Sequence, residues 1–138
     1  MIILDTNVVS AMMPDPPDSM VLQFLDRRAF DSICTTAITL FEIKFGIERL
    51  PVGRRRRQFE EAFSRAVEGT FRDRILPFDE RAAISAAVLR ADRAQRGVPM
   101  EDRDTMIAGI VISRRAEFAT RNVRHFADVG AVIDPWNT

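Results

Sequence analysis

Three carboxylates far apart in the chain, Asp5, Glu42 and Asp104, are candidates for a shared site. If the fold brings them together, their like charges repel and favour a bound cation. The chain has one cysteine, Cys34, and one histidine, His125, so the ligands of such a cation are oxygen atoms. Oxygen ligands predict Mg²⁺ or Mn²⁺ and a reaction at a phosphoester, in which a metal-activated water attacks phosphorus.

Asp5 directly follows the apolar run Ile2–Leu4, which reads as a buried strand. Ligands of parallel α/β sheets bind outside the carboxyl ends of the strands, so an acid at this point is a candidate site residue. Asp5 is equally suited to cap a short helix over Val8–Met12. The sequence leaves both roles open.

Glu42 lies in a segment, Ala37–Leu50, that is apolar on nearly every face and therefore predicts a buried helix. A buried carboxylate is costly unless it is paired or bound to a metal. Lys44 and Arg49 are not spaced three or four residues from Glu42, where helix ion pairs form. These observations favour a functional role for Glu42.

Asp104 aligns with apolar residues three, four and seven positions further on, which form a core-facing stripe. It is expected to point at the end of the sheet, although complementing the helix dipole would also explain it. Asn122 follows the fourth apolar run and offers an amide oxygen, but by itself it is an ordinary turn residue. We expect all four side chains to meet in one crevice.

The elements that must position these residues alternate along the chain. Five short apolar runs predict strands at Ile2–Leu4, Ser32–Thr35, Arg74–Leu76, Phe118–Thr120 and Ala131–Ile133. Helical patterns cover Ser19–Arg28, Ala37–Leu50, Arg54–Glu68, Glu80–Arg96 and Asp102–Glu117, with Asp79 and Asp102 as caps of the last two. This alternation predicts a three-layer α/β/α sandwich around a central, mainly parallel five-stranded sheet.

Composition places limits on the architecture and the partners. A length of 138 residues predicts a single domain over residues 1–138. The 20 basic and 20 acidic groups cancel, which argues against indiscriminate nucleic-acid binding. We expect no disulfide, signal peptide or membrane span, and therefore a cytoplasmic protein. The run Arg54–Arg57 reads as a solvated helix start or as a guide for phosphates.

Several short motifs together resemble PIN-domain proteins, specifically VapC-type toxins of bacterial toxin–antitoxin pairs. The resemblance covers the whole chain, and the order and spacing of the motifs make it specific. They are Leu4-Asp5-Thr6-Asn7, Ala37-Ile38-Thr39 before Glu42, Arg74–Asp79, Asp104 with Ile107-Ala108, Ala119–Asn122 before His125-Phe126, and Asp134-Pro135-Trp136.

The resemblance implies a Mg²⁺- or Mn²⁺-dependent endoribonuclease with Asp5, Glu42 and Asp104 in the acidic positions. It also implies hydroxyl groups of Thr6 and Thr120 near the site, an RNA substrate, a homodimer and a cognate DNA-binding antitoxin. Many relatives carry Asp where this chain has Asn122, so the fourth ligand is neutral here.

The resemblance leaves the remaining motif residues with supporting roles. His125 is expected to be a packing or hydrogen-bonding residue, and Trp136 to dock the tail. The small residues of Glu80–Arg96 would permit a close helix approach in the homodimer; they are Ala82, Ala83, Ala86, Ala87 and Ala91.

Other classes of protein fit less well. A haloacid-dehalogenase-type phosphatase needs a second Asp two residues after the first, where this chain has Asn7. A phosphate-accepting receiver domain needs a lysine after a late strand, and the only lysine is Lys44. A non-catalytic module that binds its antitoxin and modulates promoter binding remains the alternative, favoured by Asn122 and disfavoured by the three intact acids.

Overall fold

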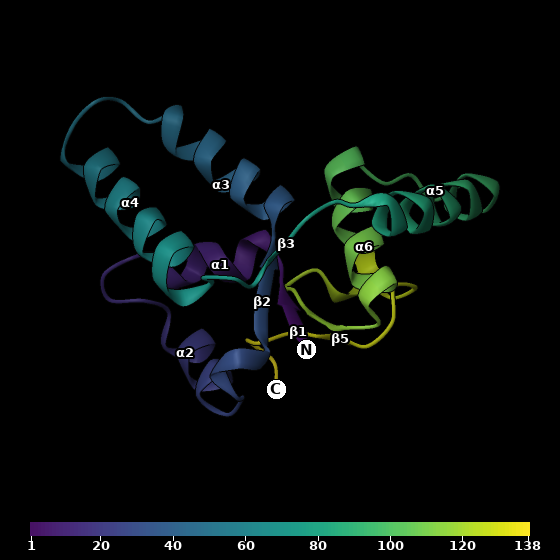
Figure 1. The fold of residues 1–138 in the computed structure, drawn as a ribbon, viewed down its shortest axis with the longest axis horizontal. Coiled ribbons are helices and arrows are strands. Elements are labelled where there is room, and N and C mark those ends of the chain that lie inside the picture. Colours follow the sequence, from purple (N-terminus) through teal and green to yellow (C-terminus); the bar gives the residue numbers. More distant parts are fainter.

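The computed structural model describes residues 1–138 and contains a five-stranded sheet in which every neighbouring pair is parallel (Figure 1). The strand order is β3-β2-β1-β4-β5, so β1 lies at the centre. The strands are β1 (Ile2–Leu4), β2 (Ile33–Thr36), β3 (Ile75–Leu76), β4 (Glu117–Ala119) and β5 (Val132–Ile133). All five strands predicted from the sequence are present, and the parallel sheet is confirmed.

Six α-helices connect these strands. They are α1 (Thr6–Met12), α2 (Ser19–Asp26), α3 (Ala37–Glu48), α4 (Arg54–Arg65), α5 (Glu80–Gln95) and α6 (Asp102–Arg114). Three short helical turns accompany them: η1 (Phe30–Ser32), η2 (Ala66–Thr70) and η3 (Val123–Phe126).

The five predicted helices each end one to three residues earlier than expected, and the predicted cap of one is wrong. Asp102 does not cap α6 but is its first residue, and the cap position belongs to Glu101, whose side chain makes no capping bond. The helix predicted to continue to Glu68 stops at Arg65, where a single π-helical turn follows. Asp79 does cap α5, because its carboxylate accepts a hydrogen bond from the backbone N–H of Ala82 at 3.0 Å.

Helices cover both faces of the sheet, which makes the predicted three layers. Side chains alternate along β1: Ile2 and Leu4 join a core formed with α1, α2 and α3, whereas Ile3 joins a core formed with α5 and α6. Figure 1 shows α1 to α4 on one side of the strands and α5 and α6 on the other. Both cores therefore meet at β1, and the residue after β1 lies between the two helical layers.

The contact between α5 and α6 is unusually close at Gly109. A Cβ atom at Gly109 would lie 2.4 Å from the carbonyl oxygen of Ala82 and 2.7 Å from the Cβ of Ala86. Ala82 and Ala86, expected to pack in a homodimer, therefore pack against α6 of the same chain. The face of α5 that stays exposed carries Ala83, Ala87 and Ala91 together with Ile84 and Val88, which are 66% and 67% exposed.

Helix α3 is not buried on all sides, so this prediction is wrong. Only Thr39, Ile43 and Ile47 are buried, whereas Phe41 and Phe45 are 59% and 49% exposed. The helix contacts α1, α4 and α6 along one side and leaves the other open. Its apolar composition therefore reflects an uncovered surface as well as a core.

The C-terminal segment docks as expected for Trp136. Its indole Nε1–H donates to the Asp18 carboxylate at 3.0 Å, and the Arg121 guanidinium lies 3.7 Å from the ring centroid. The single cysteine, Cys34, is buried and free. None of the helices combines the length and apolar character that crossing a membrane requires.

Candidate active site

Asp5 is the first residue after β1, and the backbone holds it at the carboxyl edge of the sheet. Its N–H donates to the Ala119 carbonyl at 2.9 Å, as the parallel ladder with β4 continues. Its carboxylate accepts bonds from the Thr6 N–H at 2.8 Å and from the Thr120 hydroxyl at 2.7 Å. Asp5 thus does cap α1, and it does so in a position only 5% exposed between the two layers.

The surroundings of Asp5 disfavour its charge. Burial raises the pKa of this carboxyl to about 6; the hydrogen bonds from Thr120 and Thr6 act in the opposite direction, and the nearby charges of Asp104 and Glu42 raise it further. The three acids are therefore close enough to interact electrostatically. A cation placed beside Asp5 would relieve both the burial cost and the repulsion.

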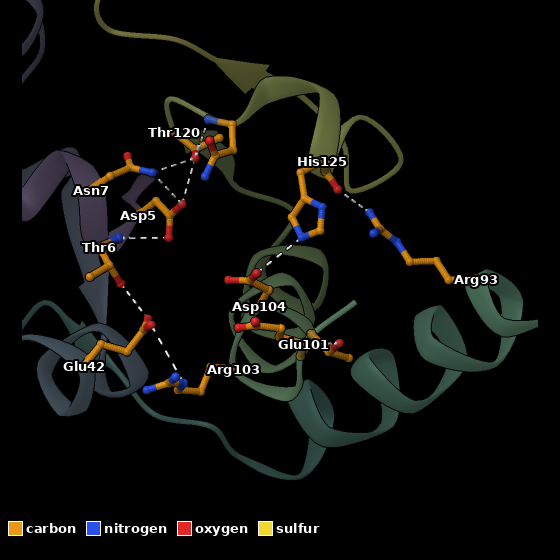
Figure 2. A network of polar contacts seen from close by, with 12 residues as sticks. Asp5, Thr6, Asn7, Glu42, Arg93, Glu101, Arg103, Asp104, Thr120 and His125 are labelled. Atoms are coloured by element: carbon orange, nitrogen blue, oxygen red, sulfur yellow. Dashed lines mark hydrogen bonds and ion pairs between the residues drawn. The ribbon is translucent and has the colours of Figure 1, made fainter. Parts of the chain in front are cut away.

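Glu42 reaches the same region from α3. Its Oε1 accepts a hydrogen bond from the Thr6 hydroxyl at 2.7 Å (Figure 2). This hydroxyl also lies 3.1 Å from the Thr39 hydroxyl. Its Oε2 lies 3.9 Å from Nε of Arg103 on α6. The Glu42 side chain is 22% exposed, so it stands at the margin of the site rather than in its core.

Asp104 is the third residue of α6 and comes from the opposite layer. Its Oδ2 lies 3.2 Å from Nε2 of His125, which belongs to η3 (Figure 2). Arg93, on α5 and only 3% exposed, donates from Nη2 to the His125 carbonyl and pairs with the Asp128 carboxylate. The buried arginine thereby fixes the turn that brings His125 to Asp104.

Thr120 links the loop after β4 to Asp5. Its hydroxyl donates to Asp5 and accepts a bond from the Asn122 backbone N–H at 3.1 Å. Asn7 adds a contact that the sequence did not indicate: its Nδ2 donates to Asp5 Oδ2 at 3.3 Å, and its Oδ1 accepts from the Arg121 N–H at 3.2 Å. The available signals were its position two residues after Asp5 and its place in the Leu4–Asn7 motif.

The three carboxylates share this edge of the sheet without forming a ready cage for a cation. No group of three Asp, Glu, His or Cys side chains converges closely enough to hold one. Each acid instead has its own partner: Asp5 has Thr120, Glu42 has Thr6 and Asp104 has His125. The donor set is nonetheless all oxygen and includes a buried carboxyl of raised pKa, which suits a hard divalent cation.

Comparison with known proteins adds a family and near relatives. The family model described as PIN domain matches residues 2–132. The chain is 34% identical over 137 residues to VapC ribonuclease Y4jK of Sinorhizobium fredii, and the aligned region covers 99% of this chain and 98% of that protein. It is 33% identical over 139 residues to Toxin FitB of Neisseria gonorrhoeae, covering 99% of each.

Among solved structures, the fold matches a structure of FitAB bound to an IR36 DNA fragment. The TM-score is 0.89 with 31% sequence identity, covering 100% of this chain and 97% of that one. The similarity includes all five strands and both helical layers, because it extends over the whole length. Fold and sequence therefore agree on one family.

Proposed function

The chain belongs to the PIN-domain family, and on that basis we propose that it is the ribonuclease toxin of a toxin–antitoxin pair, which hydrolyses phosphodiester bonds in RNA. The observation that carries the proposal is that Asp5, Glu42 and Asp104, from three distant parts of the chain, share one edge of the sheet and lie close enough for the charges of Asp104 and Glu42 to raise the pKa of Asp5. Relatives named as a VapC ribonuclease and a FitB toxin support both the reaction and the role.

In this proposal Asp5, Glu42, Asp104 and Asn122 hold Mg²⁺ or Mn²⁺. The bound ion would supply charge stabilisation at the phosphate and a more acidic water. Thr120 and Thr6 orient the acids, since their hydroxyls already donate to Asp5 and Glu42 at 2.7 Å. Arg103 lies near Glu42 and His125 contacts Asp104, so both partners would have to move aside for these acids to bind an ion.

The proposal is tested with purified protein freed of antitoxin and a structured RNA. We expect cleavage with Mg²⁺ or Mn²⁺ and its loss on chelation, followed by recovery when the metal is restored. Cleavage that persists in chelator would contradict the metal-dependent mechanism. RNA binding without cleavage under any metal would instead favour the alternative, a non-catalytic module that binds its antitoxin, for which the neutral Asn122 is the supporting observation.

The antitoxin is proposed to cover the open side of the site. A groove of about 260 Å³ at Glu42 is half apolar, with Met13 just after α1, Ile47 of α3 and Phe59 of α4 in its lining, and Arg55 of α4 adds a basic group. The exposed Phe41 and Phe45 lie on the same helix as Glu42. An antitoxin segment with apolar side chains and one basic group fits this combination, because the basic group can replace Arg103 at Glu42.

A homodimer is proposed to form through the exposed face of α5. Ile84 and Val88 lie one helical turn apart on that face, and Ala87 beside them allows a close approach. We expect Ile84→Glu with Val88→Glu to convert a dimer into a monomer of unchanged fold in light scattering. Met20→Glu, which charges a residue 47% exposed on α2, is the control and should leave the dimer intact. A wild-type monomer at micromolar concentration would contradict this interface.

Asn122 offers a direct test of the ligand set. Replacing Asn122 by Asp adds a negative charge near the ion, worth on the order of a few kcal/mol at an effective dielectric of about 20 before desolvation and repulsion reduce it. We expect Asn122→Asp to lower the Mg²⁺ concentration for half-maximal cleavage and Asn122→Ala to raise it moderately. If a Mg²⁺ titration shows that Asn122→Asp needs as much metal as wild type, Asn122 is not a ligand.

A further inference from the structure

A second groove opens beside the candidate site, on the far side from the apolar groove of α3. It has a volume of about 910 Å³ and lies between the loop after β4 and the C-terminal segment. Its cationic lining comes from Arg121 and Arg124, His125 adds an imidazole ring, and amide side chains come from Asn122 and Asn137. This volume is ample for a ligand of nucleotide size.

The charges of this groove are not neutralised within the chain. Arg121 and Arg124 are both exposed, and neither has a carboxylate partner within 4.0 Å, unlike Arg93 and Arg96 nearby. The one acid in the lining, Asp134, has an oxygen that accepts the Trp136 backbone N–H at 2.9 Å. That bond leaves the charge of Asp134 in place, so the lining carries two arginine charges against one carboxylate and presents a net positive charge to solvent.

Arg121 is also held in place before any ligand arrives. Its guanidinium lies 3.7 Å from the centroid of the Trp136 ring, and the indole N–H of Trp136 is bound to Asp18. Stacking on an aromatic face restrains an arginine without cancelling its charge or using its N–H donors. A restrained donor loses less conformational entropy when it binds an anion.

The groove is continuous with the acids through two shared residues. His125 lines the groove and its ring lies 3.2 Å from Asp104; Asn122 lines it and its N–H bonds to Thr120, which bonds to Asp5. An anion lying on Arg121 and Arg124 is thus next to the carboxylates. A chain of phosphates can reach both the acids and the arginines, since one phosphate can lie at the acidic edge while its neighbours lie on Arg121 and Arg124.

We propose that this groove, built from Arg121, Arg124 and His125, binds the sugar–phosphate backbone of the RNA substrate beside the cleaved bond. The proposal rests on the proposed ribonuclease function. It assigns to the arginines the task of offsetting the repulsion between RNA and the acidic edge. Because phosphates rather than base edges are contacted, the groove contributes affinity and register but no sequence preference.

The test measures binding separately from cleavage. In an Asp5→Asn background, binding of a fluorescent single-stranded RNA is followed by anisotropy over a range of salt concentrations. Adding Arg121→Ala and Arg124→Ala should weaken binding roughly 10- to 100-fold, because charge-assisted hydrogen bonds to two phosphates are lost. The slope of log affinity against log salt should become shallower by about 1.4, that is, about 0.7 for each phosphate contact on a single strand.

The matched control removes the same charge elsewhere. Arg27 and Arg72 are exposed, have no ion pair and lie shortly before β2 and β3, at the opposite edge of the sheet. Arg27→Ala with Arg72→Ala should leave the salt slope unchanged. Arg121→Lys with Arg124→Lys should restore most of the slope. Trp136 fluorescence reports whether the C-terminal segment stays docked in each variant.

The outcomes separate this inference from the proposed function. If wild type cleaves RNA and the Arg121/Arg124 alanine variant binds with unchanged affinity and slope, the groove assignment is wrong while the ribonuclease function stands. If wild type never cleaves but the alanine variant loses RNA binding, hydrolysis is wrong and the groove stands. If RNA binding is unchanged while affinity for a polyglutamate peptide falls, the groove is a protein-docking surface and the proposal is overturned.

Discussion

Asp5→Asn is expected to abolish RNA cleavage while making the folded protein more stable. The rate should fall by about a thousandfold or more, since at the proposed metal-assisted centre the lost charge stabilisation would be worth several kcal/mol. The side chain keeps its size, and its amide oxygen can still accept the hydrogen bond from the Thr6 N–H, which preserves the cap of α1. Loss of activity would thus come from the charge and not from the fold.

The stability gain follows from the raised pKa. The pKa of Asp5 is about 6 in the folded chain, against an ordinary value of 3.8, because burial and the neighbouring acids disfavour its ionised form. Its contribution to folding is therefore fully present below about pH 4 and is lost as pH rises through 6. Above pH 6 the ionised carboxylate costs on the order of 2–3 kcal/mol, which Asn avoids apart from the weakened bonds to Thr120 and Asn7.

Urea unfolding in chelator from pH 4 to 8 checks this prediction. The stability of Asp5→Asn relative to wild type should increase between pH 4 and 6 and then stay constant, with a gain of about 1–3 kcal/mol. Asp15→Asn, at an exposed position, is the control and should alter neither cleavage nor the pH profile. A variant that still cleaves, or one that unfolds more easily at pH 8, would contradict the role given to Asp5.

The largest effect on stability is expected at Arg93. Its side chain is only 4% exposed, donates from Nε to Asp128 at 2.9 Å and also bonds to the His125 carbonyl. Partial burial raises the pKa of Asp128, but the hydrogen bonds from Arg93 and Arg96 outweigh it and hold this pKa below its ordinary range. Arg93→Ala removes the buried partner and opens a cavity, so we expect a loss of about 3–5 kcal/mol at neutral pH.

Arg96→Ala is the matched control, because it removes a second arginine from the same Asp128 carboxylate. The Arg96 side chain is 47% exposed, and exposed pairs contribute about 0–1 kcal/mol. Because the pKa of Asp128 is lowered, the effect of Arg93→Ala should also shrink as pH falls through the range where Asp128 is protonated. Equal losses for the two variants would show that burial does not decide the strength of this pair.

Much of the fold was predictable because its signals are local. Each strand is a short apolar run, and Asp5 follows the first one directly, so its place at the sheet edge needs only the rule for parallel sheets. The capping role of Asp79 likewise depends on residues close in sequence. The predicted helices are all present, with C-terminal ends one to three residues too long in the prediction.

What the sequence did not reveal depends on pairs brought together by packing. Arg103 approaches Glu42 only because α6 crosses near α3, and His125 reaches Asp104 only because Arg93 fixes the turn η3. The exposure of Phe41 was missed for the opposite reason: an apolar residue that awaits a partner has the same composition signal as a core residue. The periodicity of apolar residues predicts a helical face but does not show whether another surface covers it.

The close packing at Gly109 restricts which substitutions this position can accept during evolution. No side chain fits there without moving the α5 backbone, and Asp104 lies five residues earlier on the same helix. Substitution at this remote, chemically inert position would displace an acid of the site as effectively as a change beside it. A genetic selection for cells that survive expression of the protein should therefore return Gly109 alongside the acids, and lineages that keep the enzyme active should keep this codon for glycine.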